Sequence, residues 1–189
     1  MLTRIIVVVL LSHFLSGCVA LVNAFGHDFT DPEKTMVLMQ LYSPEGASFD
    51  SATFQALTNE NRHSMLNSYR QDNGCMTMMS VFDAGSYELV SLFYNINNKG
   101  HIVYDFEEGD PDNVTFEVGP RGVVYIGAYA VTQGETSETF GFGPTNHCGN
   151  EEEAISGYDA YAMDSYLFRG TFWPERFDDK LKSMGVTSQ

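Results

Sequence analysis

Apolar residues occur along this chain in short runs, most of them the length of a β-strand. The runs that we interpret as strands cover residues 36–42, 76–82, 87–94, 101–106, 114–118, 123–131 and 140–142. Turn-forming Gly, Asn, Asp and Pro residues separate them. The run at 123–131 is apolar on both faces, which predicts a central strand covered on both sides. The pattern therefore predicts a mainly β fold, an antiparallel β-sandwich.

Two segments depart from the strand pattern. Pro174 stands where the first residue of a helix is favoured. Phe177, Leu181 and Met184 follow at helical spacing, and a glycine ends the run. We expect a short amphipathic C-terminal helix here, packed onto the sandwich. Residues 50–70 fit either a helical turn or strands, and the pattern leaves both open.

The first eighteen residues have the layout of a bacterial export signal. Arg4 precedes an apolar run at 5–11, and the small residues Ser16 and Gly17 stand at the expected cut site. The run is too short for a membrane-spanning helix, which needs roughly 20 apolar residues. The next residues, Leu15-Ser16-Gly17-Cys18, resemble the lipobox of bacterial lipoproteins. That resemblance implies cleavage before Cys18 and acylation of this cysteine.

The signal divides the chain into three parts. We expect a signal peptide at 1–17, a lipidated cysteine with a short tether at 18–34, and one sandwich domain at 35–189. Val19 follows the cysteine where an aspartate would resemble an inner-membrane sorting signal. We therefore expect a periplasm-facing protein anchored by its lipid in the outer membrane.

The charge of the chain limits its partners. It has 25 acidic and 10 basic residues, a net charge of −15, and loss of Arg4 with the signal gives 9 − 25 = −16. Such a domain repels the phosphate backbone, so we expect no nucleic-acid partner. It is not attracted to an anionic membrane surface either, so the lipid must supply the attachment.

Two cysteines remain once Cys18 is assigned to the lipid by resemblance. Exported chains meet an oxidising compartment, where Cys75 and Cys148 would pair into a disulfide closing a loop of about 73 residues. The alternative is a Cys148 nucleophile activated by the adjacent His147. Neighbours in sequence rarely face each other, so we favour the disulfide.

Two further stretches, 82–90 and 116–127, resemble a known fold family. The first contains Gly85 and Tyr87 between apolar residues and is similar to a corner of prealbumin (transthyretin)-like sandwiches. The second is similar to a strand pair in small bacterial lipoproteins with that fold. Asp83 departs from the family pattern, which often has Pro there. The resemblance implies a prealbumin- or immunoglobulin-like sandwich and lends no catalytic residues.

Few residues suggest a binding site. The weak candidates for a Ca²⁺ site are the carboxylates of Glu107, Glu108, Asp110 and Asp112. They do not form an EF-hand loop, and the histidines lack zinc-ligand spacing, so we assign no metal or other cofactor. Tyr158 and Tyr161 are expected to lie in a Gly- and acid-rich loop after Cys148, to be exposed and to contact a partner.

These features predict a non-enzymatic protein. No nucleophile elbow, phosphate-binding loop or dinucleotide-binding motif occurs in the sequence. We expect a lipid-anchored module that binds or supports another envelope protein. The alternatives are a calcium-dependent binder and an envelope hydrolase whose site has no recognisable motif.

Overall fold

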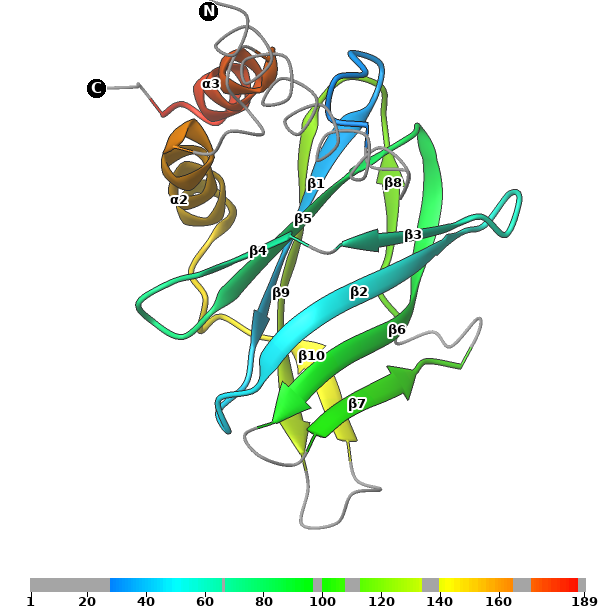
Figure 1. Ribbon diagram of the computed structural model, residues 1–189. Helices are drawn as coiled ribbons and strands as arrows, with labels where there is room; N and C mark the ends of the chain where they lie inside the picture. Colours follow the sequence, from blue (N-terminus) through cyan, green and yellow to red (C-terminus); the bar gives the residue numbers. More distant parts are fainter. Residues whose placement is uncertain are drawn as a thin grey trace, which may run out of the picture.

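Short strands and two C-terminal helices make up the fold (Figure 1). The computed structural model describes residues 28–65, 67–96, 100–107, 113–133, 140–164 and 171–186. The strands are β1 (Thr35–Tyr42), β2 (Ser48–Ala56), β3 (Arg62–Met65), β4 (Asn67–Arg70), β5 (Met76–Phe82), β6 (Gly85–Ile96), β7 (Gly100–Asp105), β8 (Thr115–Val118), β9 (Val123–Gln133) and β10 (Phe140–Pro144). The helices are α2 (Glu151–Asp164) and α3 (Trp173–Ser183).

The strands form two sheets that pack as the predicted β-sandwich. Sheet A has the order β10-β9-β1-β5-β4, and sheet B has the order β3-β2-β6-β7. The long strand β6 pairs with β8 along its first half and with β7 along its second half. The described strand pairs are antiparallel except one, because β1 runs parallel to β9. The sequence pattern did not predict this parallel pair.

The central strands of sheet A are covered on both faces, which explains their unbroken apolar sequence. Val37 and Met39 of β1 point into the space between the sheets. Met36 and Leu38 point to the opposite face, where the two helices lie. In β5, Met78 and Met79 divide in the same way. Alternate side chains point to opposite faces of a strand, so both sets must be apolar.

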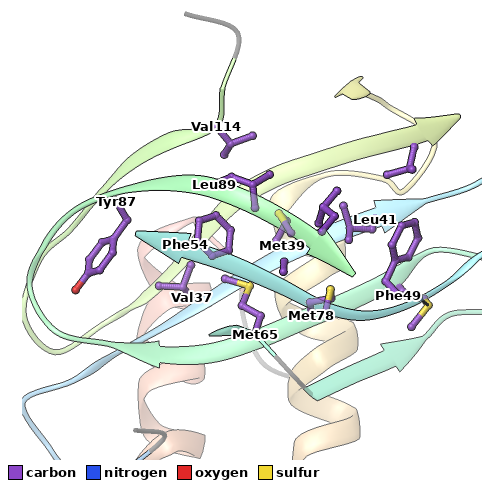
Figure 2. Close-up of a cluster of buried hydrophobic side chains, with 14 of the residues drawn as sticks. Val37, Met39, Leu41, Phe49, Phe54, Met65, Met78, Tyr87, Leu89 and Val114 are labelled. Atoms are coloured by element: carbon purple, nitrogen blue, oxygen red, sulfur yellow. Dashed lines mark hydrogen bonds between the residues drawn. The ribbon is translucent and has the colours of Figure 1, made fainter. Parts of the chain in front are cut away.

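Side chains from both sheets fill the core between them (Figure 2). Phe54 of β2, with no exposed surface, contacts Phe82 of β5 and Phe116 of β8 edge to face, at ring-centroid distances of 5.9 and 5.2 Å. The other labelled members are Val37, Met39, Leu41, Phe49, Met65, Met78, Tyr87, Leu89 and Val114. Their contacts join the sheets across the sandwich.

The predicted C-terminal helix is confirmed as α3. Phe177 and Leu181 are buried at the predicted helical spacing, together with Trp173 at the start of the helix. These side chains pack on the outer face of sheet A, where they meet Met36 and Leu38. No helix among the described residues is long and apolar enough to cross a membrane.

The described residues of the ambiguous segment 50–70 form most of β2, a turn at 57–61, β3 and β4, so the helical alternative was wrong. Helix α2 was not predicted. Gly157 has a low helix propensity and weakens the signal in the sequence, and only Ala154, Ile155 and Tyr158 are buried along the part of the helix whose side chains are described. A capping signal was nevertheless present in the sequence just before the helix. Asn150 Oδ1 accepts a bond from the Glu153 backbone N–H at 2.9 Å, and Glu153 Oε2 accepts one from the Asn150 N–H at 3.3 Å.

The tight corner between β5 and β6 depends on Tyr87. Its hydroxyl donates to the carbonyl of Asp83 at 2.9 Å, and its ring lies close to Gly85. A Cβ at residue 85 would sit 3.6 Å from that ring. Burial raises the pKa of the Tyr87 hydroxyl to about 12, so it remains a donor at physiological pH. The Gly-x-Tyr spacing thus fixes where the chain turns back.

Candidate binding surface

The two lateral sides of the sandwich are closed in different ways. On one side, β3 of sheet B and β4 of sheet A are separated by a single residue, so the chain itself joins the sheets. On the other side, the edge strands β7 and β10 face each other without a covalent connection between them. We call the side formed by β7 and β10 the open side. It lies in the half of the molecule away from α3 (Figure 1).

Aromatic rings fill the open side. Tyr104 of β7 stacks on Phe140 of β10 with 3.6 Å between ring centroids. Phe106, just beyond β7, meets Phe142 edge to face at 5.0 Å, and Tyr129 of β9 stacks on Phe142 at 5.1 Å. All five side chains are only partly buried. Large rings that are partly exposed between two sheet edges are typical of a contact surface.

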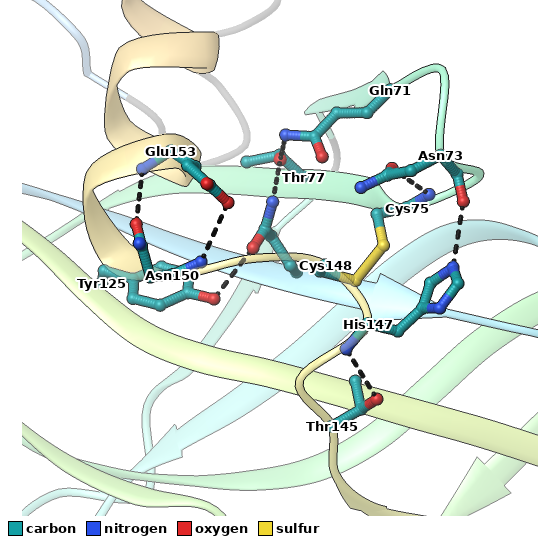
Figure 3. The surroundings of a disulfide bond; sticks show 11 residues. Gln71, Asn73, Cys75, Thr77, Tyr125, Thr145, His147, Cys148, Asn150 and Glu153 are labelled. Atoms are coloured by element: carbon teal, nitrogen blue, oxygen red, sulfur yellow. Dashed lines mark hydrogen bonds between the residues drawn. A yellow bond between two sulfur atoms is a disulfide. The ribbon is translucent and has the colours of Figure 1, made fainter.

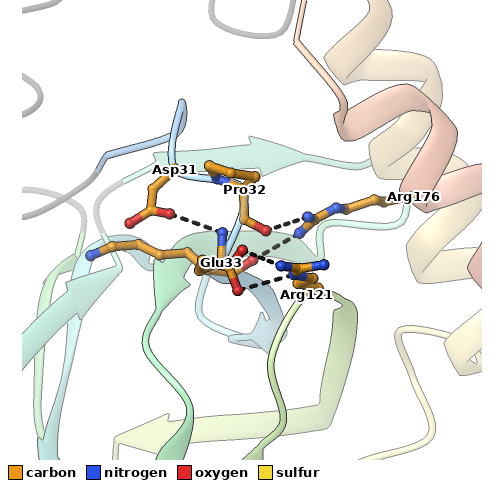
Figure 4. A network of polar contacts seen from close by, with 6 residues as sticks. Asp31, Pro32, Glu33, Arg121 and Arg176 are labelled. Carbon is orange, nitrogen blue, oxygen red and sulfur yellow. Dashed lines mark hydrogen bonds and ion pairs between the residues drawn. The ribbon is translucent and has the colours of Figure 1, made fainter.

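The opposite end holds the base of the expected tether. Trp173 Nε1 of α3 donates to the carbonyl of Phe29 at 2.8 Å, and Arg176 donates to the carbonyl of Lys34 at 2.8 Å. The Arg176 guanidinium also donates to the carbonyl of Pro32 (Figure 4). It lies over the ring of Phe172, 4.2 Å from the centroid. Helix α3 therefore fixes the direction in which the chain enters the domain.

An ion pair supports this end from the neighbouring loop. Arg121 donates two bonds to the carboxylate of Glu33, one of them from Nε at 3.0 Å (Figure 4). These bonds lower the pKa of Glu33. Both side chains are well exposed, so the pair adds little stability and mainly orients the segment.

The structure joins Cys75 and Cys148 in a disulfide with 2.10 Å between the sulfur atoms (Figure 3). Because the sulfur of Cys148 is bonded to Cys75, it is not a free nucleophile in this structure, and both residues are buried. His147 points elsewhere: Nε2 lies 3.2 Å from the carbonyl of Asn73, and its ring stacks on Tyr42 at 3.8 Å. The bond links the start of β5 to the loop before α2 and so ties the helices to sheet A.

The prediction that Tyr158 is an exposed contact was wrong. It lies in helix α2 rather than a loop, is 1% exposed, and packs on Phe177 at 6.0 Å. Sequence reasoning misplaced it because the helix was not recognised. Tyr161 belongs to the same helix, but its side chain lies outside the described residues, so its role stays a prediction.

The remaining predicted site residues lie largely outside the described part of the chain. Cys18 falls there, as do Glu108, Asp110 and Asp112 of the calcium candidate. Glu107 is described and exposed. Among the described residues, no group of three or more His, Cys, Asp or Glu side chains could hold a metal ion.

Two half-buried titratable groups, His63 and Asp159, and one fully buried amide, Gln40, lie inside the fold. Burial lowers the pKa of His63, which stacks on Phe82 at 5.3 Å. Burial raises the pKa of Asp159 in α2, and the nearby Asp178 of α3 adds to that effect. Gln40 is fully buried, and its Oε1 accepts a bond from the Tyr125 hydroxyl at 2.9 Å. This bond satisfies a polar group between sheet A and the helices.

Two hollows on the described surface are large enough to admit a small molecule. One, of about 370 Å³, is lined by Leu57, Ser86, Thr115, Phe116 and Glu117. The other, of about 360 Å³, is lined by Gln71, Asp72, Asn73, Cys148, Glu153 and Gly157. Asp72 and Glu153 are both exposed, and Glu153 caps α2.

Comparison with known proteins gives distant and partial similarities. No protein-family model and no curated protein matches the chain. A candidate cell adhesion protein from Bacteroides fragilis is 8% identical, with a TM-score of 0.41, over 63% of this chain and 47% of that chain. A leucine-rich repeat protein from Bacteroides thetaiotaomicron is 13% identical, with a TM-score of 0.38, over 53% of this chain and 14% of that chain. The matched region is thus less than half the length of each of these two proteins.

Proposed function

We propose that this protein is a lipid-anchored envelope module that binds or supports another envelope protein, without catalysis of its own. The lipobox-like residues at 15–18 supply the anchor in this proposal. The observation that carries it is the fastening of residues 28–34 to α3, at the end away from the open side. An anchored chain held in this way directs the open side away from its own attachment point.

The length of the tether limits how far the domain stands from the bilayer. Asp28 stands ten positions after Cys18, and an extended chain spans at most about 3.5 Å per residue. The base of the domain therefore lies within about 35 Å of the lipid. A partner must reach the open side from the periplasmic space or from a neighbouring membrane protein.

The anchor is tested by acyl labelling and membrane fractionation in a bacterial host. The wild-type chain is expected to incorporate labelled palmitate and to sediment with the outer membrane, whereas Cys18→Ser loses both properties. Ser16→Ala keeps a small residue before the cleavage site and serves as the matched control, expected to behave as wild type. An unlabelled wild-type chain recovered in the soluble fraction would refute the anchor.

Binding is tested by crosslinking the acylated protein in native membranes. Crosslinker placed at Val103, exposed on β7, is expected to capture one dominant envelope protein. Crosslinker placed at Glu175, exposed on α3, serves as the control position. Equal capture at both positions would contradict a specific role for the open side.

A further inference from the structure

The outer edge of β10 has backbone groups that no described strand pairs with. β10 is the last strand of sheet A, with β9 on its inner side. The Thr145 N–H donates to the Ala128 carbonyl at 2.9 Å, in the same antiparallel register that pairs β10 with β9. Because hydrogen bonding alternates along such a pair, the N–H groups of Phe140 and Phe142 point away from β9. They form the edge to which another strand could be added.

This edge lacks the side chains that usually discourage strand pairing. Natural edge strands are protected by charged residues, bulges or prolines. β7 fits this rule, because Asp105 is exposed on it and Glu107 is exposed two residues further on. β10 has the sequence Phe-Gly-Phe-Gly-Pro and no charge, and only Pro144, at its end, interrupts the row of N–H groups. The protection is therefore unequal on the two strands of the open side.

The charge of the chain selects the partner. With a net charge of −15, two copies of this chain would repel each other, which opposes pairing of β10 with a second β10. The exposed carboxylates of Asp105 and Glu107, on and just after β7, add to the negative charge of the open side. A partner segment with Lys or Arg residues is attracted instead.

We propose that β10 binds an extended, basic segment of an envelope protein by strand addition to sheet A. This inference rests on the proposed function and names the surface and the chemistry of the partner. Alternate side chains of the added strand would face sheet B and cover the partly exposed rings of Tyr104 and Phe140. The other side chains of the added strand stay in solvent on the outer face, where the net negative charge of the chain favours basic residues, so the segment alternates apolar and basic residues.

Amide hydrogen exchange tests the inference on the full chain in detergent micelles. The probe is an acetylated and amidated eight-residue peptide that alternates valine and lysine, and the control peptide alternates valine and glutamate. At saturating lysine peptide, exchange at the Phe142 amide is expected to slow about tenfold or more. The Gly143 amide, which the register directs toward β9, is expected to change little. The glutamate peptide is expected to leave both amides unchanged.

A pair of substitutions at Gly143 tests the role of charge. Nothing lies within 4 Å of a Cβ built there, so both Gly143→Lys and Gly143→Glu fit the fold. The first is expected to weaken binding of the lysine peptide and the second to strengthen it, each by about two- to fivefold. Equal effects of the two variants would overturn the charge argument.

Other outcomes also overturn the inference. Exchange at Phe140 and Phe142 that does not slow with the lysine peptide removes β10 as the binding edge. Slow exchange without peptide, together with a concentration-dependent dimer, would assign the edge to a second copy. Acylation of Cys18 is measured separately by palmitate labelling. Peptide binding without acylation would remove the proposed anchor while leaving the β10 edge intact.

Discussion

Replacing both Cys75 and Cys148 by alanine is expected to lower the free energy of unfolding by about 5 kcal/mol, of which about 4 kcal/mol comes from loss of the cross-link. The disulfide closes a loop with a sequence separation of 73 residues. In the chain-entropy model, a cross-link of this loop length removes about 15 cal/mol/K from the unfolded chain, or about 4 kcal/mol at 25 °C. Loss of the two sulfur atoms, buried beside Ala128 and Tyr42, adds on the order of 1 kcal/mol.

Urea unfolding of the exported protein, with and without reductant, measures this effect. At a slope of about 2 kcal/mol per molar urea, the midpoint should fall by about 2 M on reduction. Trp173, the one tryptophan of the sequence, is fully buried at the helix layer and reports it by fluorescence. Far-UV circular dichroism reports the sheets, and coincidence of the two transitions supports a two-state analysis.

The comparison of three samples separates the cross-link from packing. Reductant should lower the midpoint of the wild type nearly to that of the Cys75→Ala/Cys148→Ala variant and leave the variant itself unchanged. Equal midpoints for oxidised and reduced wild type would refute the entropic reasoning. Two free thiols, found by mass spectrometry in the exported wild-type protein, would refute the disulfide itself.

Three further predictions concern His63, Asp159 and Trp173. The unfolded chain binds a proton at His63 more readily, so stability should fall as pH decreases from the ordinary pKa of 6.5 toward the lowered folded value. His63→Gln should remove this fall from a plot of melting temperature against pH, and an unchanged plot would contradict the argument. Asp159→Asn removes a carboxyl whose pKa is raised by folding, so it should increase the melting temperature at pH 7, and no increase would contradict that reasoning. Trp173→Phe loses the bond to the Phe29 carbonyl and should cost about 1–3 kcal/mol in urea unfolding, and a cost near zero would show that this bond does not hold the tether base.

Local patterns were sufficient where one side-chain repeat decides the structure. The apolar runs at 36–42 and 76–82 agree with β1 and β5, and Phe177 and Leu181 predicted α3 from their spacing. Cysteine counting and the export signal indicated the pair of Cys75 and Cys148, and these two residues are bonded in the fold. The strand and helix signals are short range, so the residues themselves specify them.

The site required distant parts of the chain to be placed together. Tyr104 and Phe140 meet on the open side although they belong to different sheets, and only the strand order reveals this contact. Tyr158 failed as an exposed contact because weak periodicity hid α2 and therefore its burial. A half-exposed ring and a buried ring look alike in a sequence.

What the sequence by itself determined is therefore the strands other than β2, β3 and β4, the last helix and the excess of negative charge, together with the choice of Cys75 and Cys148 as the disulfide pair. The tertiary structure decided which strands are neighbours, including the parallel pair of β1 and β9. It also decided that β10 ends sheet A, with an outer edge that no described strand covers. Strand pairing joins residues far apart in the chain, and its energy depends on packing of whole faces, which no local repeat encodes.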